Sequence, residues 1–79
     1  MEISKEAIRE ILKEIDILSE VDGLSDELGL VEQGVDSLDM ANLYLKLEEK
    51  FKIKIPDTDL HLVQSINGIY EYLQSKRES

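Results

Sequence analysis

Few side chains of this sequence could perform chemistry by themselves. Its 79 residues include one histidine, His61, and no cysteine, which excludes thiolate metal sites and a cysteine nucleophile. A calcium loop opening at Asp57 would need glycine and glutamate at the positions that Leu62 and Gly68 occupy. A chain this short also has little room to enclose a substrate pocket of ~300 Å³ or more. We therefore expect neither an enzyme nor a dedicated metal site.

The serine in the segment Asp36-Ser37-Leu38-Asp39 is the remaining candidate for chemistry. This segment opens a predicted helix, and either Asp36 or Ser37 could cap it. If Asp36 is the cap, the Ser37 hydroxyl can point to solvent. A phosphate ester on Ser37 would be favoured by the unpaired N–H groups and the dipole of the helix start. The pattern permits a modification site at Ser37, and a plain capping serine is the other interpretation.

Apolar residues at helical spacing predict the elements that position Ser37. The expected helices cover residues 4–18, 36–51, 57–62 and 65–73, and the polar tail at 75–79 is expected to fray. A connection of unusual length, from about residue 19 to residue 36, separates the first two helices. Its apolar residues should pack against the helices; they are Leu24, Leu28, Leu30 and Val31. The sequence predicts one all-α domain, residues 1–79: a small four-helix bundle of three main helices and one short helix, with a long first loop.

The predicted helix at 36–51 carries two apolar faces. The wider face would be buried in the bundle and consists of Met40, Leu43, Tyr44, Leu47 and Phe51. A narrower stripe on nearly the opposite side consists of Leu38, Ala41 and Leu45. This stripe either packs under the long loop or forms an exposed apolar patch of the kind that binds proteins. Both interpretations stand at the level of sequence.

The negative charge lies entirely in the first half of the chain. Residues 1–39 carry 12 acids and 3 bases, a net charge of −9, whereas residues 40–79 carry 6 of each. Such a chain is unsuited to nucleic acid, and the lysines after residue 45 have no interleaved stacking aromatics. The acids at residues 20–27, or Asp36 and Asp39, could attract divalent cations weakly. The expected partner is a protein with a basic patch.

The sequence contains no signal-peptide pattern and no apolar run of the ~18 residues that a membrane span needs. We therefore expect a cytoplasmic protein without a membrane span. We also expect it to be a monomer.

The segment around Ser37 resembles a known family. Residues 30–40, Leu-Val-Glu-Gln-Gly-Val-Asp-Ser-Leu-Asp-Met, resemble the 4′-phosphopantetheine attachment motif of acyl carrier proteins, with Gly34 two positions before Asp36. The similarity continues without a gap. Residues 45–51 resemble the end of the family's second helix, and residues 53–57 resemble the approach to its short third helix.

The resemblance implies a carrier of acyl groups. Ser37 would hold a covalent 4′-phosphopantetheine arm, transferred from coenzyme A by a phosphopantetheinyl transferase, and acyl groups would ride on the arm as thioesters. Acyl-transferring or condensing enzymes would be the further partners. The resemblance places the partner-binding face at Asp36, Leu38, Asp39, Ala41, Leu45, Glu48 and Glu49. It places the lining for a sheltered acyl chain at Met40, Leu43, Tyr44, Leu47, Ile55, Leu62, Ile66 and Ile69.

The sequence departs from the family pattern along the predicted second helix. Asn42 stands where an acid is common, and Lys46 interrupts the same surface. Residues 37–51 carry three acids and two lysines, a net charge of only −1. Fatty acid biosynthesis and a polyketide or other specialised pathway both remain open. Peptidyl carriers usually have a histidine where Asp36 stands, so they fit less well. The alternative from another class is an unmodified helical adaptor.

Overall fold

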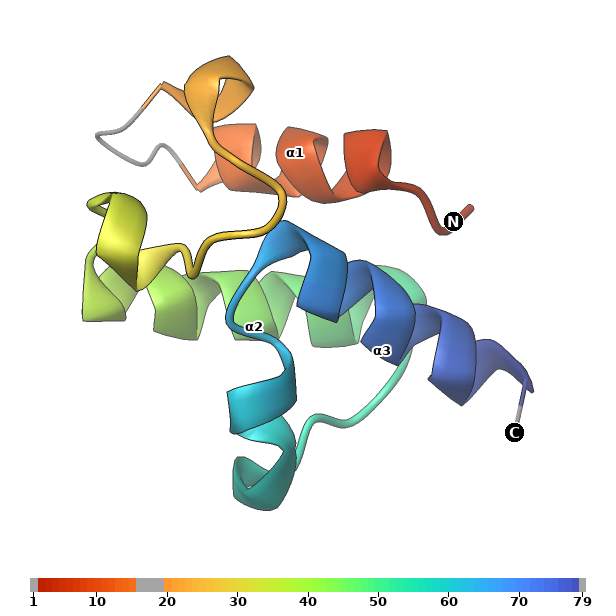
Figure 1. Cartoon of the computed structure of the whole chain (residues 1–79). Coiled ribbons are helices and arrows are strands. Elements are labelled where there is room, and N and C mark those ends of the chain that lie inside the picture. The colour runs from red at the N-terminus through yellow and green to blue at the C-terminus, as the bar shows by residue number, and fades with distance from the viewer. Residues whose placement is uncertain (1, 16–19, 79) are drawn as a thin grey trace.

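A computed structural model describes residues 2–15 and 20–78 of the chain, residue 78 by its backbone alone. The described residues form helices and no strand (Figure 1). The elements in chain order are α1 (Lys5–Glu14), η1 (Val21–Gly23), η2 (Val31–Gln33), α2 (Ser37–Phe51), η3 (Asp57–Leu62) and α3 (Ile66–Glu78). The all-α prediction, with three main helices and one short helix after the second, is confirmed. The long connection also contains two short 3₁₀ turns, which the sequence did not predict.

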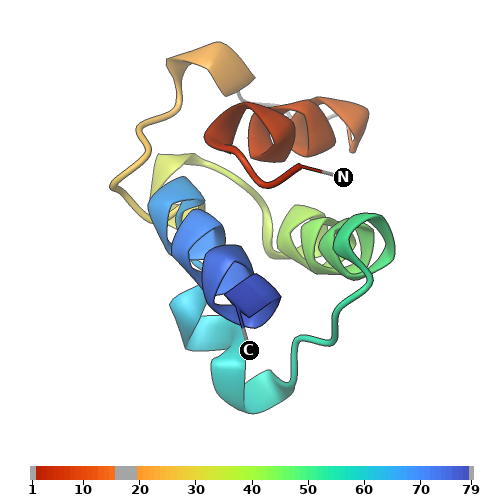
Figure 2. The same ribbon diagram turned by 90° about the vertical axis from the view of Figure 1, so that its right-hand side faces the viewer.

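The three α-helices enclose the core between them. Figure 2 views α2 and α3 nearly along their axes, side by side, with α1 lying across them and η3 on the far side. α1 contacts both α2 and α3, and η3 contacts α3. This arrangement places the start of α2 at one end of the molecule. The end of α2, the end of α3 and the N-terminal segment share the other end (Figure 1).

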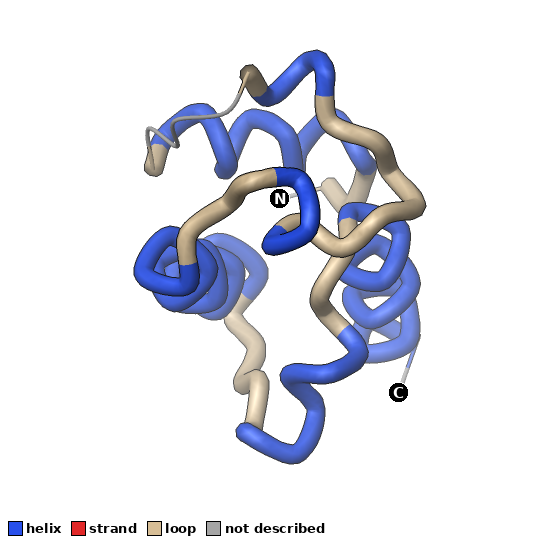
Figure 3. The backbone as a smooth tube through the Cα atoms, turned by 60° about the vertical axis from the view of Figure 1, so that its left-hand side comes forward, coloured by secondary structure: helices blue, strands red, loops and turns tan. Residues whose placement is uncertain are grey.

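The three α-helices, the long connection and the segments on either side of η3 contribute to one hydrophobic core. Its buried residues are Ile8, Ile11, Leu12, Val21, Leu24, Leu30, Val35, Met40, Leu43, Leu47, Ile55, Val63, Ile66, Ile69, Tyr72 and Leu73. Within the connection, the expected packing is correct for Leu24 and Leu30 and wrong for Leu28 and Val31, which are exposed. Leu28 lies in a bend and Val31 in η2, where only some side chains can face inward. Figure 3 shows the connection as loop interrupted by short helical turns.

The helix boundaries follow their predicted caps at the N-terminal ends. The Ser4 hydroxyl accepts a hydrogen bond from the Ala7 N–H at 3.0 Å, and the Ser65 hydroxyl accepts one from the Gly68 N–H at 3.0 Å. α1 ends at Glu14, with Ile15 as its C-cap. The expected continuation to Leu18 falls partly outside the described residues.

The C-terminal helix is longer than the sequence predicted. α3 continues to Glu78, so the expectation of a fraying tail is wrong for residues 75–78, and residue 79 lies outside the described residues. The last turn carries Lys76 and Arg77, and cations at a helix C-terminus interact favourably with the helix dipole. Leu73 and Tyr72, both buried, hold the preceding turn against the core. The helix can therefore extend past its last core contact.

Gly68 lies in the first turn of α3, where helix propensity alone would favour alanine. A Cβ atom on this residue would stand 2.5 Å from the backbone oxygen of Leu62. The end of η3 therefore packs directly on the backbone of α3. The absence of a side chain at residue 68 permits this close approach.

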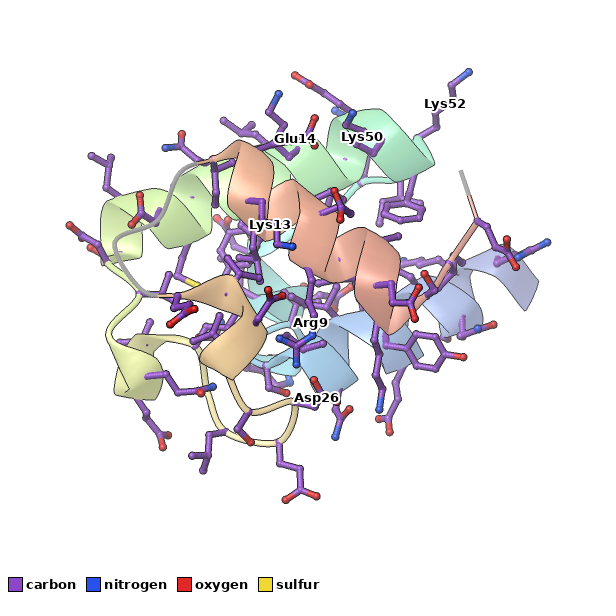
Figure 4. All side chains as sticks on the ribbon, turned by 90° about the horizontal axis from the view of Figure 1, so that it is seen from above. Arg9, Lys13, Glu14, Asp26, Lys50 and Lys52 are labelled. Atoms are coloured by element: carbon purple, nitrogen blue, oxygen red, sulfur yellow. The ribbon has the colours of Figure 1, made fainter. Side chains whose placement is uncertain are left out.

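Arg9 of α1 holds the long connection in place (Figure 4). Its guanidinium donates hydrogen bonds to the carbonyl oxygens of Val21 at 2.6 Å and Leu24 at 3.0 Å. It also pairs with the carboxylate of Asp26, which Lys5 approaches at 3.7 Å. One half-buried cation thus satisfies two loop carbonyls and one loop acid.

The same connection is tied to the start of α3 through backbone hydrogen bonds. The Leu30 N–H donates to the Gln64 carbonyl at 2.7 Å, and the Asn67 N–H donates to the Asp26 carbonyl at 2.9 Å. The Gln33 side chain adds a paired contact, accepting from the Ser25 N–H at 2.6 Å and donating to the Ser25 carbonyl at 3.0 Å. The long connection that leads into α2 is therefore held by α1 through Arg9 and by the start of α3 through backbone hydrogen bonds.

Candidate functional site

The start of α2 presents the Ser37 hydroxyl to solvent. Asp36 is the N-cap, with an extended backbone (φ −66°, ψ 150°), and its Oδ1 accepts a hydrogen bond from the Leu38 N–H at 3.1 Å. Ser37 is exposed, and its hydroxyl makes a longer hydrogen bond, 3.4 Å, to the same Asp36 oxygen. Of the two caps that the sequence allowed, Asp36 is the one used. Ser37 remains accessible to a modifying enzyme.

A glycine turn sets the direction of the chain just before this cap. Gly34 has φ 100°, in the left-handed region that favours glycine, and its N–H donates to the Val31 carbonyl at 3.1 Å. The Val35 N–H then donates to the Leu30 carbonyl at 3.0 Å, and the Val35 side chain is buried. The turn thus places the Val35 side chain in the core. The next two residues, Asp36 and Ser37, are exposed.

The narrow apolar stripe of α2 is exposed. Leu38 is 70% exposed and Leu45 is 58% exposed, and Ala41 between them is also exposed. Of the two interpretations of this stripe, the exposed patch is confirmed, and packing under the long loop is wrong. The loop turns toward α1 and α3, where Arg9 and Gln64 hold it, and leaves this face of α2 uncovered. The stripe begins beside Ser37 and runs along the helix.

The acids expected at the partner face differ in their surroundings. Asp36 and Glu49 are exposed, and Asp39 is half-buried. Glu48 is also half-buried, and its Oε2 accepts a hydrogen bond from the Ile55 N–H at 2.8 Å. Glu48 therefore fastens the segment after α2 to the helix, a structural role that the sequence did not suggest. Of the other three acids, Asp36 has a structural role as the N-cap of α2.

Seven of the eight residues expected to line an acyl site belong to the core or pack against it: Met40, Leu43, Tyr44, Leu47, Ile55, Ile66 and Ile69. Leu62 is a correction, because it is 48% exposed. Its backbone oxygen faces α3 at Gly68, which turns the side chain away from the core. The next residue, Val63, is fully buried in its place.

Tyr44 is the polar member of this lining. Its hydroxyl accepts a hydrogen bond of 2.8 Å from the Gln64 side chain, which also donates to the Leu60 carbonyl at 2.6 Å. Burial raises the pKa of Tyr44, and the bond from Gln64 partly opposes this rise. The phenol is therefore neutral at physiological pH and acts as a fixed polar group at the edge of the core.

Two acids of the connection, Asp22 and Asp26, pair with cations of α1. Asp26 pairs with Arg9 and Lys5, and Asp22 lies 3.4 Å from Lys13. Among the described residues there is no group of three or more side chains that could hold a metal ion. His61 is exposed at the end of η3. The ion pairs of Asp22 and Asp26 therefore help to hold the connection against α1.

Three residues that hold the approach to Ser37 were missed by sequence reasoning: Arg9, Gln33 and Gln64. The Arg9 and Gln33 side chains bond to backbone groups elsewhere in the chain, and the backbone carbonyl of Gln64 accepts from the distant Leu30 N–H, so no local pattern marks these residues. The one available signal was the place of Arg9 beside the buried stripe of its helix, where an arginine can reach polar groups at the rim of a core.

No helix in the part of the chain that the structure describes is long and apolar enough to cross a membrane.

Comparisons with known proteins agree with this geometry. The profile of the family "Phosphopantetheine attachment site" matches residues 5–73. The acyl carrier protein of Syntrophobacter fumaroxidans is 32% identical over 72 residues, covering 84% of this chain and 89% of that protein. The acyl carrier protein of Campylobacter jejuni is 35% identical over 60 residues, covering 75% of this chain and 78% of that protein.

A solved structure is also similar. It is a crystal structure of an engineered Bradyrhizobium japonicum glycine:[carrier protein] ligase in complex with a carrier protein from Agrobacterium tumefaciens and AMP. The match has a TM-score of 0.79 and 32% sequence identity, and it covers 90% of this chain and 99% of the matched chain.

Proposed function

Because the chain belongs to the phosphopantetheine attachment site family, together with acyl carrier proteins, we propose that Ser37 holds its 4′-phosphopantetheine arm. The protein is a carrier and not an enzyme, and 4′-phosphopantetheine is the covalent group of its family. The observation that carries the assignment of Ser37 is its exposed hydroxyl beside a helix cap already supplied by Asp36. The arm's terminal thiol supplies the thioester chemistry that a chain without cysteine lacks.

The surroundings of Ser37 fit a phosphodiester. In the loading step the Ser37 oxygen bonds to the phosphorus of the arm, and the pyrophosphate bond of coenzyme A breaks. The adenosine bisphosphate leaves, and the hydroxyl proton passes to the transferase or to water. The first N–H groups of α2 and its dipole favour the negative phosphate that results. No residue of this chain has to act as a base, because the transferase supplies that chemistry.

The partner face combines charge near Ser37 with an apolar stripe. Asp36, Asp39 and Glu49 supply its negative charge, and Leu38, Ala41 and Leu45 supply its contact surface. An exposed apolar patch rimmed by polar residues is typical of a protein interaction site. We propose that a phosphopantetheinyl transferase and acyl-transferring or condensing enzymes bind here. Glu48 contributes to this face mainly by holding the segment at Ile55.

The remaining assignments follow from the same proposal. We propose that residues 1–79 form one carrier domain that acts as a cytoplasmic monomer. A bound acyl chain would shelter among the seven core residues named above. Since these side chains are already packed together, entry of a chain would require the helices to move apart. Fatty acid or polyketide biosynthesis is the proposed setting.

A second candidate concerns the cargo. The similar carrier protein from Agrobacterium tumefaciens was solved with a glycine:[carrier protein] ligase, and its identity to this chain is as high as that of an acyl carrier protein. We therefore include an aminoacyl thioester as an alternative cargo. Both cargoes use the same arm on Ser37, so they differ only in the enzymes that load it.

Attachment at Ser37 is tested by incubation with coenzyme A and a broad-specificity phosphopantetheinyl transferase. Intact-protein mass spectrometry should record one added arm on the wild type and none on Ser37→Ala. Ser75→Ala is the matched control, because it removes another exposed serine hydroxyl and should load normally. An unmodified wild type would instead favour a helical adaptor, whose partner binding would be indifferent to Ser37→Ala.

The cargo is tested on protein purified from its native host under conditions that preserve thioesters. The added mass beyond the arm identifies an acyl or an aminoacyl group directly. A glycyl mass would support the second candidate and contradict the fatty acid and polyketide assignments.

A further inference from the structure

One cleft of the molecule gathers positive charge on an otherwise acidic protein. It lies at the end of the bundle that the ends of α2 and α3 share with the N-terminal segment (Figures 1 and 4). Its volume is about 380 Å³, and its described lining residues are Ile3, Phe51, Lys52, Ile53, Leu73, Lys76 and Arg77. Three of the nine cations of the chain therefore meet at one site, and none of these seven lining residues is acidic.

The lining divides into an apolar floor and a cationic rim. Ile3, Phe51 and Ile53 are half-buried hydrophobic residues packed against the core, and Leu73 lies beneath them. Lys52 and Arg77 are exposed at the rim. Figure 4 shows Lys52 pointing outward at the end of α2. Lys76 stacks over the Tyr72 ring, 5.3 Å from its centroid, so its place on the rim is defined by that contact.

The other clefts of the described surface differ in charge. The cleft beside Leu45 is lined by two glutamates and two lysines, and the cleft beside Tyr70 by two glutamates and one lysine. The cleft beside Leu62 has one glutamate and no cation. Among these four clefts, only the one lined by Lys52, Lys76 and Arg77 has an excess of positive charge. A cationic rim over an apolar floor is complementary to a molecule with an alkyl chain and an anionic head.

We propose that this cleft is a non-covalent site for a small anionic amphiphile, such as a medium-chain fatty carboxylate. The alkyl chain lies on Ile3, Phe51 and Ile53, and Lys52 and Arg77 bind the carboxylate. A volume near 400 Å³ is at the lower end of the range of small-ligand sites, which suits a short chain. A single dissolved molecule is favoured over a bilayer, because the net charge of −9 repels an anionic membrane.

The site is distinct from the proposed attachment site. Ser37 is the first residue of α2 and Phe51 the last, so the two sites are separated by the length of the helix, roughly 20 Å. The inference does not depend on modification of Ser37. It is tested on the Ser37→Ala chain, in which no covalent cargo can interfere.

The test is a titration of ¹⁵N-labelled Ser37→Ala protein with sodium octanoate below its micelle concentration, followed by NMR. The amide shifts should concentrate at Ile3, residues 51–53 and Leu73. Acetate, which has the head alone, and octanol, which has the chain alone, should each bind at least about tenfold more weakly. Shifts concentrated at Met40, Leu43 and Ile66 would overturn the proposal, because they would place the ligand in the core.

Two double variants with the same change in net charge distinguish the effect of the rim residues on binding from the effect of net charge. Lys52→Glu with Arg77→Glu should weaken octanoate binding about tenfold or more. Lys46→Glu with Lys54→Glu changes the net charge equally, at residues that do not line the cleft, and should alter binding less than about twofold. Equal weakening by both pairs would contradict the proposal.

Three further measurements complete the test of this ligand site. Thermal melts verify that both pairs fold, and Arg77→Gln, at an exposed position, provides a milder variant that should still weaken binding. Vesicles of phosphatidylglycerol test the membrane as an alternative source of the anionic head. Binding to vesicles without binding to dissolved octanoate would overturn the proposed ligand.

Discussion

The Tyr72 hydroxyl donates a hydrogen bond of 2.7 Å to Oδ2 of Asp59 and so ties α3 to η3. Tyr72 is only 8% exposed. Burial, the bond to Asp59 and the negative charges of Asp59 and Glu48 raise the pKa of Tyr72 to about 12. The contact fixes η3 on the side of the bundle away from α1. Its contribution to the free energy of unfolding depends on the protonation of Tyr72 and therefore on alkaline pH.

We expect Tyr72→Phe to lower the free energy of unfolding by about 1 kcal/mol at pH 7, because it removes this hydrogen bond. In the wild type the folded state keeps the Tyr72 proton to a pH near 12, whereas the unfolded chain loses it near 10. This contribution is therefore complete below pH 10 and is lost as the pH rises from about 10 to 12. Urea unfolding at pH 7, 10 and 11 should show a shallower alkaline decline in the variant. Tyr70→Phe is the control and should retain the wild-type decline.

Gly68→Ala should destabilise the protein although alanine is the better helix former. The propensity gain is about 1 kcal/mol. The new Cβ would stand 2.5 Å from the Leu62 oxygen, and relief of that clash requires movement of η3. Overpacking of this kind costs about 1–3 kcal/mol, so we expect a net loss. Gly23→Ala, where a Cβ meets nothing within 4 Å, is the control. Thermal melts that rank the two variants equally would contradict the close-approach argument.

Arg9→Ala should loosen the long connection without disturbing α1. The substitution leaves the Val21 and Leu24 carbonyls and the Asp26 carboxylate without their shared donor. We expect a loss of about 2–3 kcal/mol in the free energy of unfolding. Hydrogen exchange should be faster at residues 21–35, and phosphopantetheine loading should slow. Lys13→Ala removes a mostly exposed pair with Asp22 and should cost under about 0.5 kcal/mol.

Substitutions in the exposed stripe of α2 should weaken partner binding without lowering the stability of the fold. Leu38→Ala with Leu45→Ala should change the free energy of unfolding by less than about 1 kcal/mol, because both side chains face solvent. The same variant should be loaded more slowly by the transferase. Leu43→Ala, on the buried face, should cost about 2–5 kcal/mol. A large fall in melting temperature for the double variant would show that the stripe supports the fold.

The local chemistry of the chain predicted most of its helical structure. Ser4, Asp36 and Ser65 are capping residues whose side chains act on N–H groups two or three positions away, so their roles can be inferred from spacing. The buried stripe at Ile8, Ile11 and Leu12 follows the helical period. The motif around Ser37 likewise lies in one continuous segment, and it was the strongest signal of function.

The tertiary structure decided what depends on contacts between distant segments. Whether Leu38 and Leu45 were buried depended on where the long connection lies, and Arg9 and Gln64 hold it away from them. The exposure of Leu62 and the need for Gly68 come from one contact between η3 and α3. The cationic cleft joins residues from both ends of the sequence. Capping and periodicity act over a few residues and can be read in order along the chain, whereas packing depends on all the elements at once.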